Sequence, residues 1–127
     1  MQINLAVTRT ISIKAPPDVV FDLVGDARNL PRWAPGFARE VRADGDGWII
    51  GNGNDEVRRH VAVSSEHGTA DFLAAAGGRR GLFTRAIPNG DGTELAFTFV
   101  LSDGADAQAQ DAILATELEM IKRLCEH

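Results

Sequence analysis

The sequence predicts a single α+β domain over residues 1–127, in which seven antiparallel strands form one sheet and a long C-terminal helix packs on it. Six apolar segments between residues 38 and 102 alternate with short turn sequences, including DGDG, EHG and NGDG. Strands joined by connections this short pair antiparallel. From about Ala105 the spacing of apolar residues changes from two to the three or four residues that are typical of a helix.

The first strand is predicted over Leu5–Ile13, where apolar residues are spaced for a strand; a bulge near Arg9 is an alternative. Pro16 and Pro17 suit the first turn of a helix, because the N–H groups of that turn have no partner within the helix. The sequence VVFDLV, residues 19–24, is therefore predicted to be a short helix that ends near Gly25.

A second short helix is predicted over residues 26–30, with Asp26 as its cap and Pro31 as its end. The sequence RWAPGF that follows is predicted to be a turn that carries two aromatic side chains. Both short helices therefore lie between the first strand and the second.

The remaining elements follow from the same periodicities. The six later strands are predicted over residues 38–43, 48–52, 56–65, 69–76, 82–88 and 93–102. The C-terminal helix is predicted from about Ala105 to His127, with an apolar stripe made of Ile113, Leu114, Leu118, Ile121, Leu124 and Cys125. Charged residues lie opposite this stripe, so one face of the helix packs on the sheet and the other meets water.

Charge and hydropathy limit the classes of function. The net charge is -5, and no run of basic residues is longer than a pair, so nucleic acid is not a predicted partner. The chain has no apolar run long enough to span a membrane and no leader-like N-terminus, which predicts a cytoplasmic protein.

Motifs for metals, cofactors and catalysis are missing from the sequence. Cys125 stands alone, and the three histidines share no ligand spacing, so no disulfide and no metal site are predicted. The sequence GNGNDE lacks the third glycine of a dinucleotide loop, and Ser64 and Ser65 lack a nucleophile motif. No cofactor and no catalytic residue are predicted.

Several stretches resemble a known superfamily. The sequences APPDVVFDLVGDARNLPRW, GTADFLA and RAIPNGDGTELAFTFVL, in this order and before a long helix, are similar to the START-like or SRPBCC superfamily, which includes polyketide cyclase/dehydrase-like proteins. The resemblance implies the helix-grip fold, also called Bet v 1-like: a curved antiparallel sheet around the C-terminal helix, with a hydrophobic cavity between them. Trp33 and Phe37 would then plug or gate one end of the cavity; alternatively, Trp33 simply caps the core.

Alternation along each strand predicts which side chains line this cavity. Phe97 and Phe99 share the inward face of the last strand, and Phe72 shares that of the fifth. Leu118 and Ile121 approach from the helix. Phe83 is predicted to point inward on the sixth strand, and Asp71 is left ambiguous, on the outer face unless the register slips by one residue.

Two arginines are predicted among these inward side chains. Arg59 shares a face with three valines of the fourth strand, and Arg85 lies between Phe83 and Ile87. A buried charge needs a partner, so Arg59 and Arg85 either bind an acidic group of an apolar ligand or pair with carboxylates of the chain. The candidates for that pairing are Asp55, Glu56 and Asp71.

The sequence therefore predicts a protein that binds an apolar or acidic amphipathic small molecule. Two alternatives are kept: an enzyme of the polyketide cyclase/dehydrase type, and a module that interacts with a chaperone or another protein. A homodimer is a further option. The superfamily shares no single catalytic set, so the resemblance assigns no catalytic residue to this chain.

Overall fold

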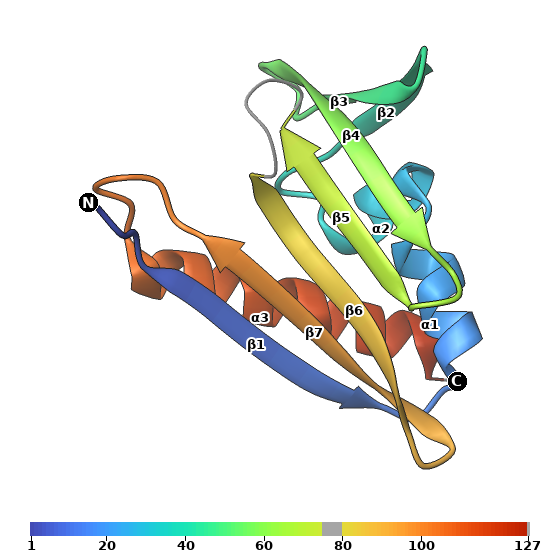
Figure 1. Cartoon of the computed structure of the whole chain (residues 1–127). Helices are drawn as coiled ribbons and strands as arrows, with labels where there is room; N and C mark the ends of the chain where they lie inside the picture. Colours follow the sequence, from blue (N-terminus) through green and yellow to red (C-terminus); the bar gives the residue numbers. More distant parts are fainter. Residues whose placement is uncertain (75–79, 127) are drawn as a thin grey trace.

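A computed structural model describes residues 1–74 and 80–126, and its strands form one seven-stranded antiparallel sheet in the order β1-β7-β6-β5-β4-β3-β2 (Figure 1). The strands are β1 (Ala6–Ile13), β2 (Glu40–Asp44), β3 (Gly47–Gly51), β4 (Glu56–Ser64), β5 (Thr69–Ala74), β6 (Gly81–Asn89) and β7 (Gly92–Val100). The helices are α1 (Pro17–Val24), the 3₁₀ turn η1 (Ala27–Asn29), α2 (Leu30–Trp33) and α3 (Ala107–Cys125). The predicted helix-grip architecture is confirmed. Residues 75 and 76, the predicted end of the fifth strand, lie outside the described residues, as does His127.

The short helices differ from prediction at Pro31. The Asp26 side chain accepts a hydrogen bond from the Arg28 backbone N–H, which confirms it as a cap. Pro31, however, lies in the first turn of α2 and does not end a helix. A proline costs little there because that turn needs no N–H donor, and the helix therefore continues to Trp33.

The register of β1 against β7 is unbroken from the pair Ala6–Val100 to the pair Ile13–Thr93, so the alternative of a bulge near Arg9 is wrong. Helix α3 packs along β1 (Figure 1). Arg9 pairs with Asp111 at 2.9 Å, and Lys122 Nζ donates a hydrogen bond to the Ser12 carbonyl at 2.7 Å. These contacts fix the helix lengthwise on the strand.

Cross-strand pairing defines the two faces of the sheet. The inner face, which packs against α3, carries Phe97 of β7, Thr84 of β6 and Phe72 of β5; the outer face carries the residues that alternate with them. The predicted inward orientation of Phe83 and Arg85 is therefore wrong, because both alternate with Thr84 and lie on the outer face. The inner positions of β6 include Leu82, Thr84 and Ala86, whose side chains are smaller than those of Phe83 and Arg85. Helix α1 packs against this strand.

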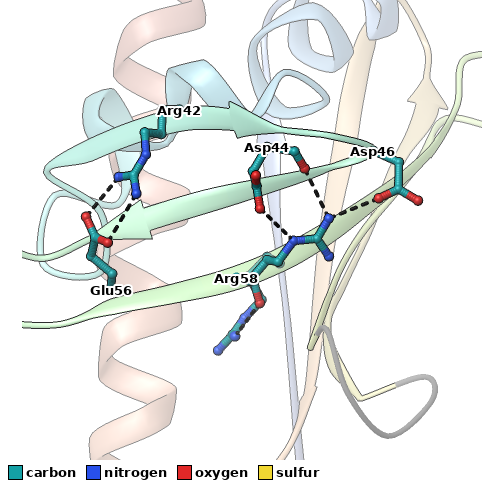
Figure 2. A network of polar contacts seen from close by, with 6 residues as sticks. Arg42, Asp44, Asp46, Glu56 and Arg58 are labelled. Carbon is teal, nitrogen blue, oxygen red and sulfur yellow. Dashed lines mark hydrogen bonds and ion pairs between the residues drawn. The ribbon is translucent and has the colours of Figure 1, made fainter.

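Ion pairs cross the outer face at the other edge of the sheet (Figure 2). Arg42 of β2 pairs with Glu56 of β4 at 2.8 Å, and Arg58 of β4 contacts Asp44 at 3.1 Å and Asp46 at 3.0 Å. All of these side chains are partly or largely exposed, so each pair contributes on the order of 0–1 kcal/mol. Glu56, one predicted partner of Arg59, is thus engaged by Arg42.

Candidate functional site

One part of the inner face is filled by aromatic side chains. Trp33 is 1% exposed and packs its ring against Phe72 and Phe97, with ring centroids 5.9 and 5.7 Å away. Leu118 and Ile121 of α3 are equally buried and belong to the same core. We call this part, defined by Trp33, Phe72 and Phe97, the closed half of the inner face.

The closed half contains one polar atom without a partner. The Nε1 of Trp33 is buried and forms no hydrogen bond with any described residue. A buried N–H that lacks an acceptor costs about 1–3 kcal/mol relative to one that has an acceptor. A ligand that brought an oxygen to this N–H would therefore gain a hydrogen bond that the chain itself does not supply.

A second part of the inner face is only partly covered, and we call it the open half. It consists of Arg59, Val61, Ala74, Leu82 and Phe99, all of which are partly exposed. Figure 1 shows why: α1 and α2 gather beside the C-terminal end of α3, and these helices contact its C-terminal half, β6 and β2. Among the described residues, the short helices therefore cover the closed half more fully than the open half.

Helix α3 presents one flank to this open half. Asp111, Lys122 and Glu126 all contact β1 and so define the opposite flank. At about 100° per residue, Glu117 lies on the other side of the buried stripe, three residues after Leu114 and four before Ile121. Ile113 lies on the same flank and is 50% exposed, so the described residues leave the N-terminal half of this flank partly open.

Glu117 is an unpaired carboxyl in apolar surroundings. It is partly buried, and it takes part in no ion pair or side-chain hydrogen bond among residues 1–74 and 80–126. Its neighbours one turn away on α3 are Ile113, Leu114, Met120 and Ile121, none of which can compensate a charge. Burial raises the pKa of Glu117 to about 7, because the charged form loses hydration.

Arg59 stands at the rim of the open half. Its guanidinium lies 5.8 Å from the centre of the Phe37 ring and donates a hydrogen bond to the neighbouring Arg58 carbonyl at 3.1 Å. Burial lowers the pKa of Arg59, but an arginine stays charged at any physiological pH. Phe37 is 37% exposed, so it forms an outer wall and not part of the core.

The structure brings most of the predicted residues together and separates two of them. Five of the predicted residues belong to one buried core, in which α3 packs with the closed half: Trp33, Phe72, Phe97, Leu118 and Ile121. Phe99 and Arg59 lie in the open half. Phe83 and the exposed Arg85 lie on the outer face, so neither can contact a ligand on the inner face. Asp71 pairs across the sheet with Ala62 and Phe83 and is likewise an outer residue.

Sequence reasoning did not find Glu117. The available signal was its position at the edge of the apolar stripe, one turn from both Leu114 and Ile121, with no basic residue three or four positions away. An acid at such a position has no partner on its own helix.

Two hollows in the surface lie away from the closed half. One, of about 350 Å³, lies where the end of β1 meets the β6–β7 turn, and the other, of about 750 Å³, lies between the N-terminal residues, Gly81 and Leu101. Among the described residues, no three His, Cys, Asp or Glu side chains gather in a way that could hold a metal ion. In the same part of the chain, no helix is long and apolar enough to cross a membrane.

Residues 4–126 match the sequence profile of the family described as polyketide cyclase / dehydrase and lipid transport. The chain belongs to this family. The match extends over both short helices, all seven strands and α3, so the resemblance seen in the sequence is confirmed as common membership. A comparison with curated proteins finds no match.

Solved structures share the fold at low sequence identity. The Aha1 dimer from Colwellia psychrerythraea is 16% identical, with 96% of each chain covered and a TM-score of 0.75. XoxI from Bacillus cereus is 15% identical over 94% of both chains, also with a TM-score of 0.75. StfQ, a di-domain ARO/CYC protein from the steffimycin biosynthetic pathway, is 18% identical, with a TM-score of 0.75 over 94% of this chain and 45% of that one. Identities this low establish the fold and not a shared activity.

Proposed function

We propose that the protein binds an amphipathic small molecule between the open half of the inner face and α3. The observation that supports this is that partly exposed apolar side chains, such as Leu82 and Phe99, share the inner side of the sheet with the carboxyl of Glu117, which has no partner among the described residues. Apolar surface left accessible stabilises an apolar ligand by about 25 cal/mol for each Å² that the ligand buries. Unpartnered polar groups then orient the ligand.

The location of the open half favours a small molecule over a protein partner. Its residues lie on the inner face, the side of the sheet on which α3 packs along β1, and this location favours an occupant small enough to fit on that side. A folded partner would need an outward-facing surface, whereas the outer face around β2 to β4 is occupied by ion pairs (Figure 2). The cytoplasmic location and the homodimer that the sequence suggested stay predictions.

A second candidate is an enzyme that transfers protons in the same place. Glu117 supports it, because a carboxyl with a pKa of about 7 can act as an acid or a base near neutral pH. The family description, which includes cyclases and dehydrases, points the same way. Binding is the proposal we favour, since among the described residues Glu117 has no hydrogen-bonded or ion-paired group with which it would share a reaction.

A titration with octan-1-ol, followed by backbone amide NMR, tests the proposal. Binding to the open half shifts the amides around Leu82 and Phe99 and broadens or moves the signals of α3 near Glu117. Two variants form a matched pair, because Leu82 and Phe83 are neighbours on opposite faces of β6 and both are partly buried. We expect Leu82→Gln to weaken binding at least about tenfold, the loss of one well-buried apolar contact.

Phe83→Gln is the control and leaves binding unchanged. Equal effects of the two variants, or shifts confined to the two surface hollows, would show that the open half is not the binding site. Native mass spectrometry of protein purified from its own host adds the identity of a retained ligand, because a bound small molecule appears as a fixed mass increment.

A further inference from the structure

The flank of α3 turned away from β1 carries an acid, where a site for anionic ligands would need a base. The sequence predicts an acidic ligand held by Arg59 and Arg85, but Arg85 lies on the outer face and Arg59 stands only at the rim. The unpaired group on the ligand side of α3 is Glu117. An anionic ligand placed beneath α3 would therefore meet a carboxyl and not a guanidinium.

We propose that Glu117, as the neutral acid, is the specificity-determining residue of this site and selects an uncharged ligand that carries a hydrogen-bond-accepting oxygen, such as a ketone. This inference rests on the proposed function and adds the chemical class of the ligand. It also makes binding dependent on one proton. The following contacts carry it.

The position of α3 places Glu117 over the middle of the inner face. Asp111 is tied to Arg9 and Lys122 to the Ser12 carbonyl, so Glu117 lies between these two levels of β1. Arg9 is the cross-strand partner of Phe97, whose ring packs against Trp33. Along the sheet, Glu117 therefore lies between the level of the Arg9–Phe97 pair and that of the Ser12–Glu94 pair.

Charged groups from the surrounding elements do not neutralise Glu117. The inner faces of the seven strands carry only two ionisable residues in the part of the chain that the structure describes, namely Arg9 and Arg59. Arg9 is engaged by Asp111, and Arg59 hydrogen-bonds to a backbone carbonyl at the rim. Burial is the one cause that shifts the pKa of Glu117, so neither arginine is close enough to hold it down.

The short helices add no countercharge either. Burial raises the pKa of the Cys125 thiol, the charge of Arg32 on α2 acts to lower it, and Cys125 lies about two turns after Glu117 on α3. On α1, Asp18 and Asp22 are exposed and of the same sign as Glu117. The surroundings therefore favour the neutral form of the carboxyl, which predominates below a pH of about 7.

The chemistry of the unpartnered carboxyl defines the ligand. A neutral carboxyl donates a hydrogen bond through its O–H. This donor is satisfied by an acceptor oxygen, and a ketone or ether offers lone pairs without a charge. A cationic ligand would instead require ionised Glu117 and would pass Arg59, which has the same sign as the ligand, at the rim.

Protonation then sets the affinity. A carboxyl with a pKa of about 7 is mostly protonated at pH 6 and mostly ionised at pH 8. If the ligand binds the protonated form alone, its apparent affinity falls about tenfold between these two pH values. Binding also raises the pKa of Glu117 further, because the ligand stabilises the form that it binds.

Four probes of equal chain length test the inference: octan-2-one, octan-1-ol, octanoate and octylamine. Binding is measured at pH 6 and pH 8, together with the side-chain carboxyl ¹³C shift of Glu117. We expect octan-2-one to bind more tightly than octanoate and to lose about tenfold in affinity from pH 6 to pH 8.

Two substitutions separate the role of Glu117 from a general charge effect. Glu117→Gln keeps a neutral donor, so its affinity for octan-2-one no longer changes with pH. Glu119→Gln removes the same charge from an exposed position of α3 and leaves the pH dependence as in the wild type.

The outcomes distinguish the inference from the proposed function. Tightest binding of octylamine with a lowered Glu117 pKa, or binding of octan-2-one that is independent of pH in the wild type, overturns the inference and leaves a ligand site in place. Binding of none of the four probes at the open half contradicts both.

Discussion

The two halves of the inner face are built from the same strands and differ in what covers them. Phe97 in the closed half is 0% exposed, whereas Phe99, two residues later on the same strand and face, is partly exposed. The difference comes from α1, η1 and α2, which are short and reach only one end of the sheet. Burial therefore concentrates stability in the closed half, and the open half keeps apolar surface free for a ligand.

The largest expected effect is at Trp33. We expect Trp33→Ala to reduce the free energy of unfolding by about 3–5 kcal/mol, because it removes a large buried side chain between Phe72 and Phe97. Urea denaturation measures it. Phe37→Ala, in the same connector but exposed, costs less than about 1 kcal/mol. A loss below about 1 kcal/mol for Trp33→Ala would show that Trp33 does not cap the core and can act as the gate that the family resemblance implies.

A direct comparison of the halves uses two phenylalanines of β7. We expect Phe97→Ala to cost about 3–5 kcal/mol of unfolding free energy and Phe99→Ala about half of that, since the second side chain is already partly hydrated. Ligand affinity changes in the opposite order, with the larger loss for Phe99→Ala. Equal stability losses would remove the distinction between a closed and an open half.

The third prediction concerns pH. Folded Glu117 titrates at about 7 and the unfolded residue near 4.5, so the folded state binds more protons between these values and loses stability as pH rises through them. We expect Glu117→Gln to be more stable than the wild type at pH 8, by about 1–2 kcal/mol after allowance for solvent screening, and equal to it near pH 4.5. Thermal or urea unfolding across this range measures the difference. A constant difference at all pH values would show that Glu117 titrates normally.

The smallest effect is expected on the outer face. Arg85→Met changes the unfolding free energy by less than about 0.5 kcal/mol and leaves the affinity for any inner-face ligand unchanged, because Arg85 is exposed and makes no ion pair with a described residue. Binding and unfolding of this variant are measured beside the wild type. Loss of affinity for octanoate alone would restore Arg85 as a ligand contact.

The sequence predicted the order of elements and the inner residues of β7, because turn signals and strict alternation are local. The prediction from sequence was wrong at β6, because it placed the large side chains of Phe83 and Ile87 on the inner face of the sheet. The turn between β6 and β7 pairs Asn89 with Gly92, which places Thr84 opposite Phe97. Counting outward from this turn would have given the right face. Side-chain size was misleading, since the inner positions of β6 are occupied by Leu82, Thr84 and Ala86 and the larger Phe83 lies outside.

The candidate site was predictable only in part. The aromatic residues of the closed half follow from strand alternation, and Leu118 and Ile121 follow from helical spacing. The open half depends on how far α1 and α2 reach across the sheet, which is a matter of three-dimensional packing. Glu117 acquires its raised pKa from that packing, so composition and motif give no sign of it.

The ion pairs of Figure 2 have a consequence for how the edge of the sheet aligns. Between Arg42 and Glu56 lies β3, whose outer positions include Gly47 and Gly51, and a Cβ on Gly47 would stand 2.8 Å from the guanidinium carbon of Arg58. The side chain of Arg58 can cross β3 only over a residue without a side chain. A one-residue slip of β3 would bring Trp48 beneath that guanidinium and turn the apolar side chains of the strand outward. Gly47 thus favours the alignment of the hairpin in which Arg58 reaches Asp44 and Asp46 across β3.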